Sequence, residues 1–269
     1  MKTGIGAVLA IITLAGCDVI APIVPPAQPA QSDVVCLWIG ADKDTYASYG
    51  ANGSEAERNF GQDGGLVVAA GMLARKNSYV HFTPPTMPEG TEILEAKLEL
   101  YHGGRNEDGY GTDDIVLNVG VIRNEPWSPL TLTWSNRPDR GGAPPSEFPL
   151  YLRSQAWSGT PDIAGAVRAM MSDPGTNYGF VISRSDIFMD HQIEKGFYSN
   201  NDHRRRQNDL GLSPRLLVKI KLPPGKTTAD MSLGFLPANN DLGRIPQPIT
   251  MARFVGSNQW PADWDVTRN

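Results

Sequence analysis

Apolar and polar residues alternate over short stretches of the chain from residue 33 onward. Residues 95–100 place charged side chains on one side and apolar side chains on the other, and residues 215–222 follow the same two-residue period. This period is typical of a strand with one packed and one solvated face. Six further stretches are predicted strands: residues 34–39, 66–70, 78–82, 115–122, 180–184 and 196–199. Glycine, proline and asparagine clusters separate them, so the pattern predicts an all-β fold, a β-sandwich of short antiparallel strands.

One short helix interrupts the strands. Pro161 suits the first position of a helix, and the Asp-Pro-Gly sequence at residues 173–175 would end it. Between these signals the apolar residues form a single stripe, which comprises Ile163, Val167, Met170 and Met171. We expect that stripe to pack into the core.

The N-terminal residues have the pattern of an export signal. A basic start at Lys2 precedes an apolar run over residues 5–14, and Leu-Ala-Gly-Cys follows, ending at Cys17. About 20 apolar residues are needed to span a bilayer, so this run is too short for a membrane helix. The sequence before Cys17 resembles the lipobox of bacterial lipoproteins, and an ordinary signal peptide is the alternative. The resemblance implies that residues 1–16 are removed and that Cys17 carries lipid, which would hold the chain on a bacterial membrane, in the periplasm or at the cell surface. Asp18 resembles a signal for retention on the inner membrane.

The remaining chain divides by composition into three parts. Residues 17–32 hold the predicted lipidated cysteine and a segment rich in proline, alanine and glutamine, which favours an extended tether. Residues 33–222 contain the predicted strands. Residues 223–269 show no sustained period but carry Trp260 and Trp264. This extension either docks on the sandwich or contacts a protein partner. We favour docking, because two solvent-exposed tryptophans would promote aggregation.

Charge and cysteine content exclude several classes of protein. The formal net charge of -5 gives no general attraction to nucleic acid. The chain has two cysteines, and lipidation of Cys17 would leave Cys36 without a partner in the chain, so we expect Cys36 to be a buried small hydrophobe. The four histidines lack metal-ligand spacing, and no nucleophile elbow, zinc helix, phosphate loop or dinucleotide motif is present.

Four groups of residues, in order along residues 33–222, resemble one family. They are Asp-Thr-Tyr at 44–46 with Asn-Phe-Gly at 59–61 and Gly-Leu-Val-Val at 65–68; Ser-Tyr-Val-His-Phe at 78–82 with residues 88–93 and 96–101; Trp-Ser-Pro-Leu-Thr-Leu-Thr-Trp-Ser-Asn-Arg-Pro at 127–138; and residues 177–180 with 197–199 and 214–218. This pattern resembles the DNRLRE domain, also described as disaggregatase-related repeats, which overlaps a family of alginate-binding carbohydrate modules. The resemblance implies a jelly-roll β-sandwich, secreted or surface-held and often appended to polysaccharide-active proteins. Residues 103–112, residues 185–195 and the C-terminal extension depart from the family pattern.

Two features are candidates for contact with sugar. His203, Arg204, Arg205 and Arg206 form a local positive cluster in an acidic chain, and arginine forks match the carboxylates of a uronic acid polymer. The alternative is a solvated loop in which these arginines pair with Asp202 and Asp209. Trp127 either stacks on the apolar face of a pyranose or packs in the core, and the same choice applies to Trp134, for which we favour the core.

Four oxygen-bearing residues are candidates for a calcium site. Calcium takes six to eight oxygen ligands, which loops at the edge of a sandwich supply. The candidate ligands are Asp42, Asp44, Asn59 and Asp63. Their spacing does not follow the EF-hand loop, and roles in turns and caps are the alternative.

Together these patterns predict a lipid-anchored, extracytoplasmic β-sandwich that binds acidic polysaccharide without catalysis. The first alternative is a structural or assembly protein that docks a protein partner through the sandwich and residues 223–269. The second is a polysaccharide lyase or hydrolase, because paired carboxylates that are distant in sequence can meet in a fold.

Overall fold

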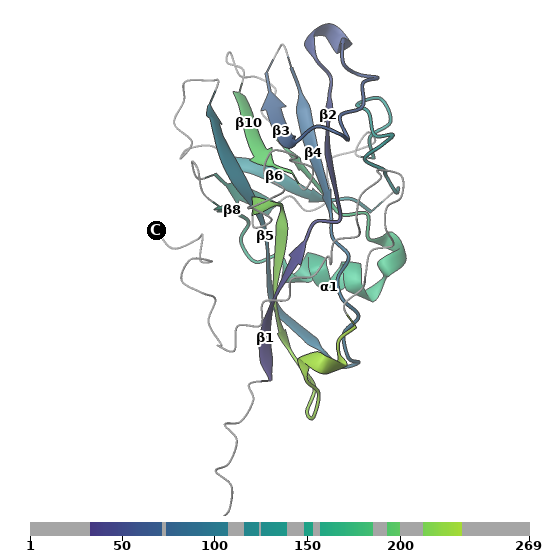
Figure 1. The fold of residues 1–269 in the computed structure, drawn as a ribbon, viewed down its shortest axis with the longest axis vertical. Coiled ribbons are helices and arrows are strands. Elements are labelled where there is room, and N and C mark those ends of the chain that lie inside the picture. Colours follow the sequence, from purple (N-terminus) through teal and green to yellow (C-terminus); the bar gives the residue numbers. More distant parts are fainter. Residues whose placement is uncertain are drawn as a thin grey trace, which may run out of the picture. The chain divides into compact units, whose positions relative to one another are not determined.

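The computed structural model describes residues 33–71, 74–106, 116–123, 125–138, 148–152, 157–184, 193–199 and 212–232 (Figure 1). These ranges hold an 11-stranded sheet. No helix in them is long and apolar enough to cross a membrane. The strands are β1 (Val34–Gly40), β2 (Lys43–Ser48), β3 (Gly65–Ala70), β4 (Lys76–His81), β5 (Glu92–Asn106), β6 (Val116–Val121), β7 (Phe148–Tyr151), β8 (Trp157–Gly159), β9 (Phe180–Ser183), β10 (Ile193–Tyr198) and β11 (Arg215–Lys221). One α-helix, α1 (Ala164–Ser172), and three short 3-10 helices complete the described elements: η1 (Ala51–Gly53), η3 (Pro174–Thr176) and η6 (Thr228–Asp230).

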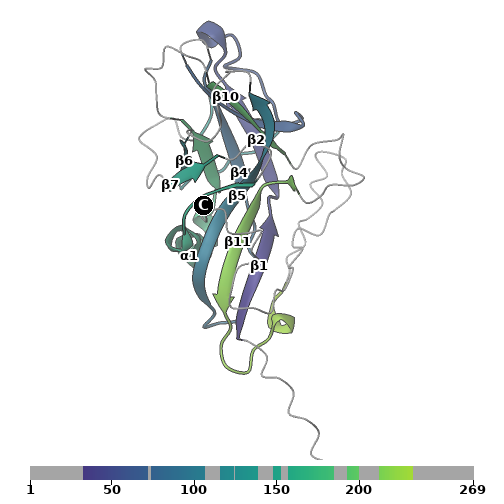
Figure 2. The same ribbon diagram turned by 90° about the vertical axis from the view of Figure 1, so that its left-hand side faces the viewer.

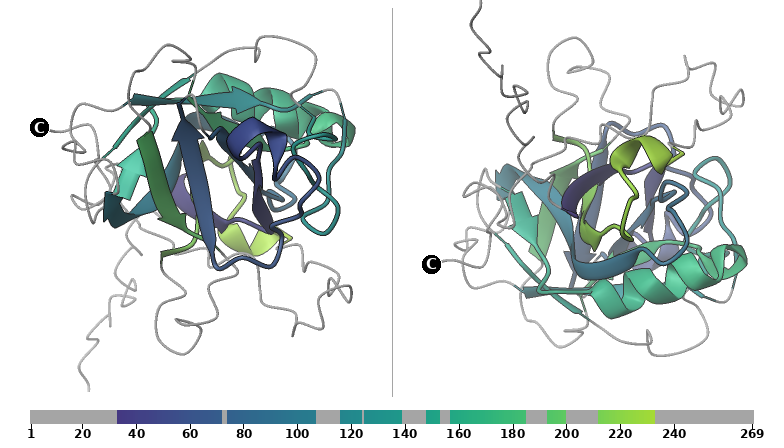
Figure 3. Two further views of the ribbon diagram at one scale, coloured as in Figure 1. Left: turned by 90° about the horizontal axis from the view of Figure 1, so that it is seen from above. Right: turned by 90° about the horizontal axis from the view of Figure 1, so that it is seen from below.

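The strands form a sheet that closes on itself. Hydrogen-bonded neighbours run in the order β1-β11-β5-β10-β3-β4-β9-β6-β7-β8, and β8 also pairs with β5. The path from β5 to β8 is therefore a closed ring of eight antiparallel strands, which Figure 3 shows end-on with α1 along one side. β11 and then β1 extend the sheet from β5, and β2 adds to β4. Closure removes most free strand edges, which are sites of unwanted pairing.

The core follows from alternation along each strand. In the adjacent strands β1, β11 and β5, which run side by side in Figure 2, Leu37 pairs with Val218 and Val218 with Ala96, and all three are buried. Full burial of one such aliphatic side chain contributes about 1.5–3 kcal/mol. Cys36 lies on the opposite side of β1, fully buried against Leu217, and burial raises the pKa of its thiol. The prediction that Cys36 is a buried small hydrophobe is confirmed.

The all-β prediction is confirmed, and the eight predicted strands correspond to β1, β3, β4, β5, β6, β9, β10 and β11. The jelly-roll connectivity stays a prediction. Three strands were not predicted, β2, β7 and β8, because their sequences show no alternation of apolar and polar residues. β7 and β8 are only four and three residues long. β2 buries polar side chains, including Asp44, Thr45 and Ser48, so the residues at its buried positions do not form the apolar pattern that predicts a strand.

The helix exists, but its predicted start at Pro161 is wrong. The residues before it bond to β5 instead. The Asp162 carboxylate accepts the backbone N–H of Ala96 and of Ala164, both at 2.9 Å, and the Thr160 hydroxyl accepts the N–H of Leu98 at 3.1 Å. Because these contacts hold residues 160–162 along the strand, helical geometry begins at Ala164. The predicted apolar stripe packs as expected, with Ile163, Val167 and Met170 buried and Met171 half-buried against the core.

The first ten residues of the C-terminal extension, 223–232, pack against the described fold. Thr86 and Ser232 exchange backbone hydrogen bonds of 2.9 and 3.0 Å, and Met231 is buried in the main core. Residues 233–269 lie outside the described residues, so docking of the whole extension stays a prediction. Residues 1–32, with Cys17, Asp18 and the tether, also lie outside them.

Candidate functional site

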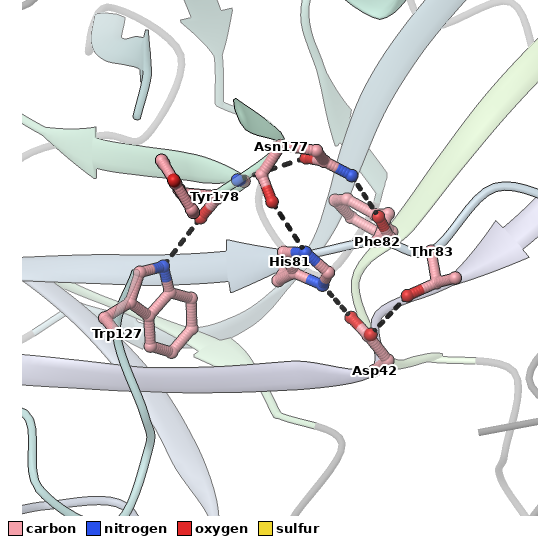
Figure 4. A network of polar contacts seen from close by, with 8 residues as sticks. Asp42, His81, Phe82, Thr83, Trp127, Asn177 and Tyr178 are labelled. Carbon is pink, nitrogen blue, oxygen red and sulfur yellow. Dashed lines mark hydrogen bonds and ion pairs between the residues drawn. The ribbon is translucent and has the colours of Figure 1, made fainter. Parts of the chain in front are cut away.

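A buried ion pair joins three segments of the fold (Figure 4). Nδ1 of His81, at the end of β4, lies 2.5 Å from the carboxylate of Asp42, which follows β1. The Thr83 hydroxyl donates to the second carboxylate oxygen at 2.7 Å. Nε2 of His81 lies 3.1 Å from the carbonyl oxygen of Asn177, whose side-chain amide donates to the Phe82 carbonyl at 2.9 Å. Both ring nitrogens thus face oxygen atoms of the protein, the Asp42 carboxylate and the Asn177 carbonyl.

The same network fixes the position of the Trp127 side chain. The indole N–H donates to the carbonyl of Tyr178 at 2.7 Å, and the half-buried ring tilts against Tyr79 with centroids 5.9 Å apart. Gly179 follows at φ +88, and a Cβ there would lie 2.2 Å from the Val80 carbonyl oxygen, so only glycine fits. These contacts favour the core interpretation of Trp127 over a sugar-stacking role.

The ion pair should make folding sensitive to acid. Burial alone would raise the pKa of Asp42, but the hydrogen bonds and charge of His81 and the Thr83 hydroxyl outweigh it, so the pKa lies below its ordinary value. A lowered native pKa adds stability at pH values above the unfolded pKa, and this stability is lost as the pH falls through the native value. We therefore expect urea unfolding to show stability falling below about pH 4.

This slope should be smaller in Asp42→Asn, which should also be less stable at neutral pH. Glu92→Gln, at an exposed carboxylate, is the matched control and should keep the parental slope. An equal acid slope in the parent and Asp42→Asn would show that this pair does not set the pH dependence.

The other three candidate calcium ligands also have protein partners. The Ser199 hydroxyl donates to Asp44 at 2.8 Å, in the buried interior. The Tyr46 hydroxyl donates to Asp63 at 2.7 Å, and burial, reinforced by this carboxylate, raises the pKa of the Tyr46 phenol. Asn59 bonds to backbone groups. Among the described residues no group of three or more His, Cys, Asp or Glu side chains gathers as a metal site. The contacts favour structural roles, and calcium binding stays a prediction.

Asn59 and Gly61 lock two loops together. The Asn59 amide donates to the carbonyls of Pro129 and Leu132 at 2.8 and 2.7 Å, and its oxygen accepts the Gly61 N–H at 3.1 Å. A Cβ at Gly61 would lie 1.9 Å from the Pro129 carbonyl oxygen, so the backbones touch there. The N–H of Ser135 donates to the carbonyl of Ala56 at 3.0 Å. The Asn-Phe-Gly motif at residues 59–61 therefore holds the loop after β2 against residues 127–138.

Residues 127–138 form consecutive turns instead of a strand. The Ser128 carbonyl accepts the N–H groups of Thr131 and Leu132 at 3.2 and 2.9 Å. The Asn136 side chain accepts the N–H of Thr133 at 2.7 Å and donates to the Thr131 carbonyl at 2.8 Å. Side-chain and turn hydrogen bonds thus satisfy the backbone groups that a strand would pair with a neighbour.

An aromatic pair and a cation meet where these two loops join. We call Tyr49, Trp134 and Arg137 the loop-end cluster. The Tyr49 and Trp134 rings lie 5.8 Å apart at 51°. The Arg137 guanidinium stacks 3.9 Å over the Trp134 ring and donates to the Trp134 carbonyl at 2.6 Å. Tyr49 is 40% exposed, and Trp134 and Arg137 are half-buried. Tyr49 could not be predicted as a neighbour of Trp134, because it lies 85 residues earlier in the chain. Arg137 is only three residues after Trp134, but its stack on the ring depends on the turn between them.

A second aromatic cluster lies on the outer side of β5, β8, β10 and β11. Arg215 Nε lies 2.6 Å from the carboxylate of Glu99, and its guanidinium stacks 3.6 Å over the Trp157 ring. Tyr101 contacts Trp157 edge-on at 5.5 Å and Tyr198 at 5.5 Å. The Glu99 side chain is fully buried and that of Arg215 is 8% exposed, so this ion pair has a structural role. Removing one partner of such a pair would leave a buried, uncompensated charge.

Comparison with known families identifies the chain. A family model for carbohydrate-binding module family 96 matches residues 39–206. The match spans more than half of the 269 residues, and the chain belongs to carbohydrate-binding module family 96. Among curated proteins no match is found. The predicted resemblance to carbohydrate-binding modules is therefore confirmed, whereas its narrower assignment to the DNRLRE domain stays a prediction. The arginine cluster at residues 203–206 falls inside the matched range but outside the described residues.

Proposed function

We propose that this chain is a lipid-anchored, extracytoplasmic module that binds acidic polysaccharide and catalyses no reaction. Membership of carbohydrate-binding module family 96 is the observation that carries the proposal. The described strands support it with a closed ring in which loops such as 49–63 and 127–138 are held rigidly. Rigid loops lower the entropy lost on binding.

The preference for an acidic ligand rests on the residues His203, Arg204, Arg205 and Arg206. A net charge of -5 repels a polyanion at long range, so a local positive site is needed to bind one. Guanidinium groups pair with carboxylates through two parallel hydrogen bonds, which neutral sugars cannot accept with the same strength. Arg137 adds a further guanidinium in the described part of the chain.

We propose that the module is not catalytic because the acidic side chains with described contacts form hydrogen bonds or ion pairs within the protein. Asp42 pairs with His81, Asp63 accepts from Tyr46, and Glu99 pairs with Arg215. A glycosidase needs two carboxyl groups about 5–10 Å apart that face a shared substrate. Incubation with polygalacturonate or alginate should therefore yield no new reducing ends and no unsaturated products.

Affinity electrophoresis tests binding directly. The chain without residues 1–16 should migrate more slowly in native gels that contain polygalacturonate or alginate than in gels without polymer. Dextran, a neutral polymer, should cause no such delay. Equal mobility in all these gels would contradict the proposed function and would move the preference to docking of a protein partner.

The lipid anchor is tested by Cys17→Ser in a bacterial host that processes lipoproteins. The thioether to lipid forms on the cysteine sulfur, so the variant should remain unprocessed or become soluble. Radiolabelled palmitate should enter the parent and not the variant. Cys36→Ser, at a buried thiol, is the control and should label like the parent. Equal lipid labelling of Cys17→Ser and the parent would contradict the anchor.

A further inference from the structure

We propose that the loop-end cluster of Tyr49, Trp134 and Arg137 is a subsite for one uronate ring of an acidic polysaccharide. The C–H face of the pyranose would stack on Tyr49 beside Trp134, and its carboxylate would pair with Arg137. This proposal rests on the proposed function and adds the place and the chemistry of contact.

Two aromatic side chains of the described residues are exposed, Tyr49 at 40% and Tyr151 at 50%, and Tyr49 is the one that lies beside a second ring and a guanidinium. Trp127 donates its N–H to Tyr178 and packs on Tyr79, and Trp157 is covered on one side by Arg215. Tyr49 is 40% exposed while its ring is still held in place by neighbours. An aromatic face that is both exposed and fixed suits a sugar ring, because stacking then orders few groups.

The backbone around the cluster explains why Tyr49 is fixed. A Cβ built at Gly53 would lie 3.3 Å from the Tyr49 ring carbons and hydroxyl, so the η1 turn packs directly against the ring. The Tyr49 N–H donates to the Arg75 carbonyl at 2.8 Å, and its carbonyl accepts the Glu55 N–H at 3.2 Å. In Figure 1 η1 lies beside residues 127–138, and the bond between Ser135 and Ala56 joins the two loops. The two rings are therefore preorganised relative to each other.

Arg137 supplies the cation for an anionic sugar at this end. It is positioned by its stack on Trp134 and by its bond to the Trp134 carbonyl. The adjoining loop also carries acids, whose carboxylates have partners in the protein: Glu55 accepts the Ser48 hydroxyl and lies 3.9 Å from Arg58, Glu57 accepts the Ser135 hydroxyl, and Asp63 accepts the Tyr46 hydroxyl. These bonds leave the carboxylate charges in place, so recognition of an anion here rests on the fork of Arg137 and not on the net charge of the loop. A guanidinium that is stacked on an aromatic ring keeps its charge and presents its edge to a carboxylate.

Point variants with matched controls test the subsite. We would titrate polygalacturonate oligomers into the parent, Tyr49→Ala, Tyr49→Phe and Arg137→Lys by calorimetry, with a melting curve for each protein. Tyr151→Ala replaces another exposed tyrosine, on β7, and Arg168→Lys replaces another arginine that donates to a backbone carbonyl, on α1. These two controls should bind like the parent.

We expect Tyr49→Ala to weaken binding about three- to tenfold and Arg137→Lys about tenfold, whereas Tyr49→Phe keeps the ring and the parental affinity. If Tyr49→Ala fails to fold, Arg137→Lys decides the question alone. Parental affinity in both Tyr49→Ala and Arg137→Lys would overturn the subsite and leave the proposed function standing. A parent that binds no polyuronate would overturn both.

Discussion

Gly61→Ala should lower the free energy of unfolding by about 3–4 kcal/mol, roughly 6–16 °C in melting temperature for a domain of this size. The new Cβ would meet the Pro129 carbonyl oxygen at 1.9 Å, a backbone atom that cannot turn away. The two loops must then separate, and the hydrogen bonds from Asn59 to Pro129 and Leu132 would be lost with the contact. Urea unfolding of the parent and the variant measures the difference.

Gly165→Ala is the matched control, because a Cβ at this position on α1 meets nothing within 4 Å. Replacement of a helical glycine by alanine stabilises by up to about 1 kcal/mol, so the control should shift in the opposite direction. A Gly61→Ala protein as stable as the parent would mean that the loops are not locked as described. The loop-end cluster would then lose its rigid base.

The triple change of Arg204, Arg205 and Arg206 to alanine should weaken polyuronate binding by the largest factor among the binding variants. A well-made contact between a guanidinium and a carboxylate contributes about 1.5–3 kcal/mol, so one lost contact corresponds to roughly 10- to 100-fold in affinity. Exposed contacts would give less, because water and salt screen them. Calorimetric titration of parent and variant with polygalacturonate provides the comparison.

The same three positions changed to lysine form the control, since they keep the charge and lose the planar fork. The lysine variant should bind with an affinity between the parent and the alanine variant. Parental affinity in the alanine variant would remove these residues from the site. Binding would then rest on other cations, of which Arg137 is the first to test.

The fold class could be predicted from the sequence because its evidence is local. Alternation around Leu98 and Val218 identifies a strand and its packed side within six or eight residues. β2 could not be predicted in this way because its buried Asp44 and Ser48 are polar; Asp44 accepts the hydroxyl of the distant Ser199, and Ser48 donates to Glu55 in the following loop. The closed ring also depends on a distant contact, the pairing of β8 with β5.

The candidate site could be predicted only in its residue types. Trp134 was a candidate from its place in a motif, but the turn that presents it depends on Ser128 and Asn136, and its neighbour Tyr49 arrives through the docking of another loop. Arg215 and Glu99 were both predictable as outward-facing, yet their pairing depends on strand register. Sequence alone does not fix register between strands more than a hundred residues apart.

Recognition of acidic polysaccharide through charge can be measured by calorimetry. The unaltered chain, without residues 1–16, would be titrated with polygalacturonate at low and at physiological salt, with dextran titrated in parallel. We expect saturable binding to polygalacturonate that weakens as salt rises, because screening shortens the reach of the charges to about 8 Å, and no binding to dextran. No heat of binding with polygalacturonate, or equal and salt-independent binding to both polymers, would contradict it.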